Sequence, residues 1–86
     1  MPYISTFFGI IIRMFYNEHN PPHFHAEYQG QKGIFDFEGN MVKGHFTSKT
    51  AKKLIKEWTL LHQDELVENW HHMEIGKQFN KIAPLD

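Results

Sequence analysis

Hydrophobic and polar residues alternate along the first half of the chain, as they do in β-strands that bury one face. The alternation covers about four or five short stretches between residues 3 and 46, with glycine-containing turns between them. Residues 30–33 are expected to form one of these turns, so that the following strand starts at Ile34. Regular turns between short strands predict an antiparallel sheet in which each strand pairs with the next.

The pattern changes to helical spacing at Thr47-Ser48, either of which can cap a helix. Apolar residues then recur every three or four positions over residues 48–75. Acidic residues that follow His62 would stabilise a new helix N-terminus, so we predict two helices with a bend near His62. The tail, residues 76–86, is expected to be irregular and to be held against the sheet by Ile82 and Leu85.

These elements together predict an α+β fold and a single domain over residues 1–86. Strands are expected at about 3–46 and helices at about 48–75. The helices should pack on one face of the sheet, because the strands and the helices each have one apolar side to bury.

Composition narrows the class of protein. Nine Lys and Arg residues against ten Asp and Glu residues give a net charge of −1, which disfavours a strong freestanding nucleic-acid binder. The chain has no cysteine, which excludes thiolate chemistry and fits a reducing compartment, so we expect a cytoplasmic protein. The apolar run from Phe7 to Ile12 is too short to cross a membrane, and no membrane association is expected.

Three histidines lie within seven residues around a Pro-Pro corner. His23 and His25 are two positions apart on a predicted strand, so their rings should point to the same side. His19 lies on the incoming loop, where the turn at Pro21-Pro22 can bring it over the other two. Arg13 projects from an otherwise apolar strand face and therefore needs a partner or a wet cleft.

Three interpretations of this corner are open. As a metal site, the three histidines and a carboxylate from Glu27, Asp36 or Glu38 would hold a divalent transition metal such as zinc. As a catalytic site, one imidazole would take a proton while another, or Arg13, stabilises developing charge, which suits RNA cleavage. As a structural feature, the rings would only hydrogen-bond their own loop, and no cofactor would be needed.

The corner also resembles a known family. The block from Ile12 to Tyr28 is similar to the small bacterial domain-of-unknown-function family numbered 4160. Trp58, Trp70 and the segment 82–85 fit the same pattern, so the resemblance covers nearly the whole chain.

The resemblance implies a compact bacterial protein, often encoded beside a second small domain of unknown function. Such an arrangement suggests a toxin–antitoxin pair in which this chain would be the toxin and its neighbour the antitoxin-like partner. The polar members of the matching block would form the site, namely Arg13, His19, His23 and His25.

We therefore expect a toxin-like protein that acts on RNA or on the translation apparatus through a histidine-rich face. His23 and His25 would be the acid and base, Arg13 the phosphate contact and His19 a loop-orienting group. The alternatives are a non-enzymatic protein-binding module and a small metal protein using His19, His23 and His25. The sequence also leaves homo-oligomer formation open.

Overall fold

The computed structural model describes residues 3–16 and 18–85. Five strands come first, and each pairs antiparallel with its neighbour in the order β1-β2-β3-β4-β5. Two helices follow, as the helical spacing predicted. The elements are β1 (Tyr3–Phe7), β2 (Ile10–Arg13), β3 (His23–Tyr28), β4 (Gln31–Asp36), β5 (Met41–Gly44), α1 (Lys49–Leu61) and α2 (Gln63–Glu74).

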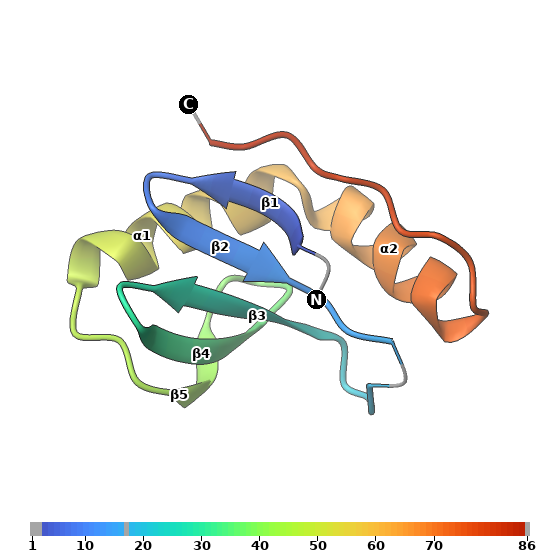
Figure 1. Ribbon diagram of the computed structural model, residues 1–86, viewed down its shortest axis with the longest axis horizontal. Helices are drawn as coiled ribbons and strands as arrows, with labels where there is room; N and C mark the ends of the chain where they lie inside the picture. Colours follow the sequence, from blue (N-terminus) through green and yellow to red (C-terminus); the bar gives the residue numbers. More distant parts are fainter. Residues whose placement is uncertain (1–2, 17, 86) are drawn as a thin grey trace.

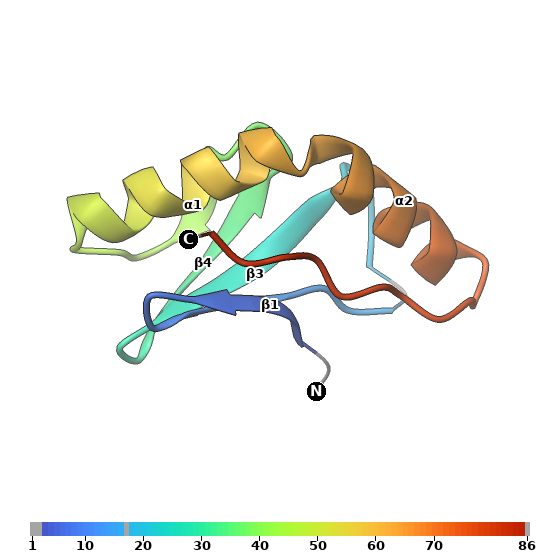
Figure 2. The same cartoon turned by 90° about the horizontal axis from the view of Figure 1, so that it is seen from above.

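Both helices lie on one face of the sheet, which confirms the predicted α+β arrangement (Figures 1 and 2). The core between these two layers consists mainly of aromatic and branched aliphatic side chains. Trp58 of α1 is completely buried there, with its ring 5.5 Å from that of Phe7 and 5.7 Å from that of Phe24. These bulky rings give a chain of this size its largest buried contacts.

Two hairpins of the sheet turn through a pair of residues with positive φ. Phe8 and Gly9 connect β1 to β2 with φ values of 50° and 79°, and Gln29 and Gly30 connect β3 to β4 with φ values of 49° and 79°. Two successive positive φ values define the tight turn whose twist matches that of the flanking strands. The prediction of a turn over residues 30–33 is therefore wrong. The turn consists of Gln29 and Gly30, and β4 begins at Gln31.

The helical region has the predicted cap and bend. The Ser48 hydroxyl accepts a hydrogen bond from the Ala51 backbone N–H and so starts α1. His62 separates the two helices, and its side chain is hydrogen-bonded to Glu65 at 2.6 Å. None of the described helices combines the length and the apolar character needed to cross a membrane.

The C-terminal tail runs beside β1 and closes that side of the core (Figure 1). The Ile82 N–H donates to the carbonyl of Ile4, and the Trp58 indole N–H donates to the carbonyl of Ala83. The buried amide of Asn69 on α2 exchanges two hydrogen bonds with the backbone of Asn80. These contacts confirm that the tail, although irregular, is held against the sheet.

The outer face of the sheet, opposite the helices, carries a row of paired side chains. Arg13 lies across from His25, His25 across from Ile34, and Ile34 across from Lys43. Alternation places these residues opposite the buried positions of the same strands. The predicted orientation of His23 and His25 to one side of the sheet is therefore confirmed.

Candidate functional site

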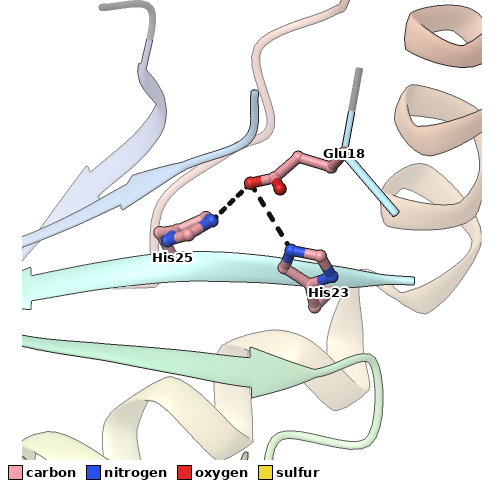
Figure 3. Close-up of side chains that lie close together, drawn as sticks. All are labelled: Glu18, His23 and His25. Atoms are coloured by element: carbon pink, nitrogen blue, oxygen red, sulfur yellow. Dashed lines mark hydrogen bonds and ion pairs between the residues drawn. The ribbon is translucent and has the colours of Figure 1, made fainter. Parts of the chain in front are cut away.

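Glu18 joins the two strand histidines at the end of the sheet (Figure 3). The loop between β2 and β3 returns so that Glu18 Oε1 lies 2.7 Å from His25 Nε2 and 3.5 Å from His23 Nε2. One oxygen thus contacts both imidazoles, and the three donor atoms all lie within 4.8 Å of one another. We call Glu18, His23 and His25 the histidine corner.

The backbone fixes the tautomer of His23. Its Nδ1 lies 2.9 Å from the carbonyl oxygen of Pro21, and a carbonyl can only accept a hydrogen bond. Nδ1 must therefore carry a proton, which leaves Nε2 of the neutral ring with a lone pair directed toward Glu18. At His25 the proton lies on Nε2 instead, because this nitrogen donates to the carboxylate of Glu18.

Aromatic side chains hold both imidazoles in place. The edge of the Phe15 ring meets His25 with 4.6 Å between ring centroids, and the two histidine rings are 5.4 Å apart. Trp70 of α2 lies 5.3 Å from the His23 ring and so connects the corner to the helical layer. The side chains of His23, His25 and Glu18 are 15%, 30% and 26% exposed, so the corner is packed from behind but remains open to solvent.

The electrostatics of the corner favour a charged carboxylate. Partial burial by itself raises the pKa of Glu18, but the hydrogen bond from His25 and the attraction that His23 and His25 exert when they are protonated together outweigh it. The net effect is a Glu18 pKa below its ordinary value. A carboxylate that stays ionised can orient an imidazole, accept its proton or ligate a cation.

Three hollows follow one another past the corner. The first, about 280 Å³, is lined by Glu18, Phe15 and three residues of α2. The second, about 170 Å³, shares Phe15 with the first and adds Arg13, His25 and Lys32. A third, about 260 Å³, shares His25 and Lys32 with the second and extends to Lys43 on the strand β5. The corner therefore lies beside a series of depressions that reaches from α2 across the outer face.

The basic residues along these hollows have no acidic partner in the described part of the chain. Every ion pair found there involves a histidine, so Arg13, Lys32 and Lys43 are without one. The Nε atom of Arg13 is buried and has no hydrogen-bond partner among the described residues. Glu27 lies opposite Lys32 in the register, so the outer face is mixed in charge with basic residues in excess along the row.

Residues 9–71 match the family described as Domain of unknown function (DUF4160). The chain belongs to this family. The match covers most of the chain and confirms the resemblance seen in the sequence. No curated protein and no solved structure matches the chain.

The part of this DUF4160 protein that matches the family contains the complete histidine corner and Arg13. Arg13 and His25 lie side by side on neighbouring strands and line the same hollow. His23 does not line that hollow, so Arg13 is brought together with one of the two strand histidines.

The structure does not bring His19 into the corner. Its side chain is exposed, and the group of converging donor atoms contains Glu18 in its place. The expectation that the Pro-Pro turn would fold His19 over the strand histidines is therefore wrong. The loop brings Glu18 to the end of the strand, and the next residue, His19, is exposed to solvent.

The carboxylate predicted for the histidine corner of this DUF4160 protein is also wrong, because Glu18 takes the place expected for Glu27, Asp36 or Glu38. Asp36 accepts hydrogen bonds from the backbone N–H groups of Glu38 and Asn40, which uses its carboxylate in the turn before β5. Glu27 lies two positions beyond His25 on β3, across from Ile11, and outside the converging group. The sequence signal that was available for Glu18 is its place beside His19 in the loop that leads into the histidine strand.

Proposed function

We propose that this protein cleaves RNA at the histidine corner and acts as the toxin-like member of a toxin–antitoxin pair. The observation that carries this proposal is the pair of imidazoles bridged by one carboxylate, open to solvent and flanked by basic residues that have no acidic partner among residues 3–16 and 18–85. A carboxylate with a displaced pKa that meets two imidazoles beside a hollow is typical of sites where a proton or a charge is moved.

Three basic side chains of the outer face, Arg13, Lys32 and Lys43, support a phosphodiester as the substrate, and we call them the basic row. Arg13, Lys32 and Lys43 lie on three different strands and follow the hollows away from His25. Phosphate groups are bound by such basic side chains, and a guanidinium can hold two phosphate oxygens at once. The overall charge of −1 is compatible with this, because three of the nine basic side chains, Arg13, Lys32 and Lys43, lie along the hollows beside the corner.

The corner can activate a nucleophile in two ways. An imidazole can take the proton of the attacking hydroxyl while its neighbour donates one to the leaving oxygen. Alternatively, the imidazoles can hold a metal ion that lowers the pKa of bound water. Both ways use the same three side chains, so cleavage should depend on His25 in either case.

Expression of the protein without its genomic neighbour should slow bacterial growth and degrade RNA. Co-expression of the neighbouring gene should restore growth, since the neighbour would cover the site. The measurement is the growth curve together with RNA integrity after induction, and His25→Ala expressed to the same level is the inactive control. Equal growth in all cases, with intact RNA, would contradict the toxin role.

Replacing Lys43 with Gln should weaken the binding of single-stranded RNA by a similar factor for every sequence tested. Loss of one phosphate contact should also lower the slope of log affinity against log salt by about 1. Fluorescence anisotropy with a labelled oligonucleotide at several salt concentrations measures both quantities.

The matched control for Lys43→Gln is Lys53→Gln, which removes the same charge from an exposed position on α1. Because α1 covers the opposite face of the sheet, this control should leave RNA affinity and its salt dependence close to those of the wild type. Equal losses in the two variants would show that net charge, rather than the basic row, governs binding.

The alternative of a non-enzymatic binding module makes a different prediction. A stable complex with the neighbouring protein that persists after His23→Ala and His25→Ala, in the absence of any RNA cleavage, would favour that alternative over an enzyme.

A further inference from the structure

We infer that Glu18, His23 and His25 form a binding site for a divalent transition metal, with zinc as the ion that the donor set fits best. The inference deepens the proposed function by naming a cofactor for the same site. Its geometric basis is the convergence of three ligand atoms, Glu18 Oε1, His23 Nε2 and His25 Nε2, on one point.

The distances between these atoms suit a shared ion. Zinc binds imidazole nitrogen and carboxylate oxygen at about 2.0 to 2.2 Å, so two ligands of a tetrahedral ion lie roughly 3.3 Å apart. Glu18 Oε1 is 2.7 Å from His25 Nε2 and 3.5 Å from His23 Nε2. Small side-chain rotations would therefore bring all three atoms to bonding distance from one ion.

The tautomer of His23 is that of a metal ligand. Histidine ligands commonly donate their second ring N–H to a backbone carbonyl, which aims the other nitrogen at the metal. The Pro21 carbonyl performs this function for His23. In a neutral ring, the lone pair on Nε2 faces a carboxylate oxygen that also carries lone pairs, and this arrangement is repulsive unless a proton or a metal cation lies between the two atoms.

Metal binding would replace the proton that His25 now shares with Glu18. The neutral His25 ring would change its tautomer as the metal bonds to Nε2, because the proton on Nε2 would pass to solvent and Nδ1 would take one up. Glu18 would exchange a hydrogen bond for a bond to the metal. Protons balance, because the ring loses one proton at Nε2 and gains one at Nδ1 for each ion that is bound.

The donor set also selects among metals. Two imidazoles and one carboxylate suit zinc and related transition ions, whereas magnesium prefers an all-oxygen shell and binds imidazole poorly. The three protein ligands leave a fourth position of a tetrahedral ion unfilled, as in catalytic zinc sites. The hollow lined by Phe15, Glu18 and Trp70 adjoins the corner and has room for water or substrate.

The test is zinc binding by the purified full chain without a polyhistidine tag. After chelation and removal of the chelator, isothermal titration with Zn²⁺ should give one ion per chain, while Mg²⁺ should give no binding at the same concentrations. Glu18→Gln should weaken zinc binding by at least about 100-fold. Loss of an outer hydrogen-bond partner alone costs about 10- to 100-fold, and Glu18 would be a direct ligand.

Glu65→Gln is the matched control for Glu18→Gln. Glu65 also accepts a hydrogen bond from a histidine, His62, at 2.6 Å, but no second imidazole shares its carboxylate. Zinc affinity in Glu65→Gln should equal that of the wild type. Circular dichroism of each variant checks that the fold is retained, and His23→Gln provides a second ligand variant.

The outcomes separate this inference from the proposed function. Absence of zinc binding by the wild type, or equal zinc affinity in the wild type and Glu18→Gln, overturns the metal site even if RNA is still cleaved. Stoichiometric zinc binding that depends on Glu18 and His23 supports the site even if no RNA is cleaved. Cleavage that stops on chelation and returns with zinc supports both.

Discussion

Replacing Trp58 with Ala is expected to remove a large part of the protein's stability at room temperature. The indole is fully buried, contacts the rings of Phe7 and Phe24, and donates a hydrogen bond that fixes the C-terminal tail. Truncation of such a side chain costs roughly 3 to 5 kcal/mol in free energy of unfolding. Native domains have a total stability of about 5 to 15 kcal/mol, and small ones lie near the lower end, so this loss is a large part of the total.

Urea denaturation followed by circular dichroism measures this loss. The control is Leu61→Ala on the same helix, where the side chain is 68% exposed. A surface substitution of this kind should change stability by no more than about 0.5 kcal/mol. Trp58→Phe should lie between the two, because it keeps ring contacts and loses the hydrogen bond to Ala83. A Trp58→Ala protein with wild-type stability would contradict the packing described for the core.

Replacing His25 with Ala should lower the rate of RNA cleavage by about 100- to 10,000-fold, the range that a positioned acid or base contributes. His25 is the residue that the corner and the outer face share. It donates to Glu18 at 2.7 Å, and it lines both hollows that carry the basic side chains. Single-turnover cleavage of a labelled RNA, with protein in excess, measures the chemical step separately from product release.

The matched control for His25→Ala is His71→Ala. The His71 ring lies on α2, is 73% exposed and has its Nδ1 at 3.8 Å from the carboxylate of Glu74. This variant removes an imidazole near an acid without touching the corner, so its cleavage rate should match the wild type. RNA cleavage by the His25→Ala protein at the wild-type rate, with its fold intact, would rule out the histidine corner as the reacting centre.

Periodicity in the sequence was sufficient to predict that strands come first and that two helices follow. The alternation at residues 23–28 correctly separated the buried Phe24 from the half-buried His23 and His25. The bend near His62 was also predictable, because acidic residues follow it where a helix N-terminus favours negative charge. Such features depend on neighbours along the chain, and the local pattern therefore contains them.

The start of β4 was not predictable in the same way. The turn was expected over residues 30–33, but Gln29 adopts a φ of 49°, which is uncommon for a residue with a side chain. The pairing of Gln31 with Tyr28 makes this strain acceptable, because it adds another paired position to the sheet. The pairing between β3 and β4 therefore determines which residues form the turn.

The sequence by itself determined that two imidazoles face the same side of a strand, because a strand turns each second side chain to the same face. Only the tertiary structure decided which acid meets them. Glu18 rather than His19 reaches the rings because the path of the loop over the strand end sets which neighbouring side chain points inward. That path depends on Phe15 and Trp70 packing around the corner, and such long-range packing leaves no periodic trace in the chain.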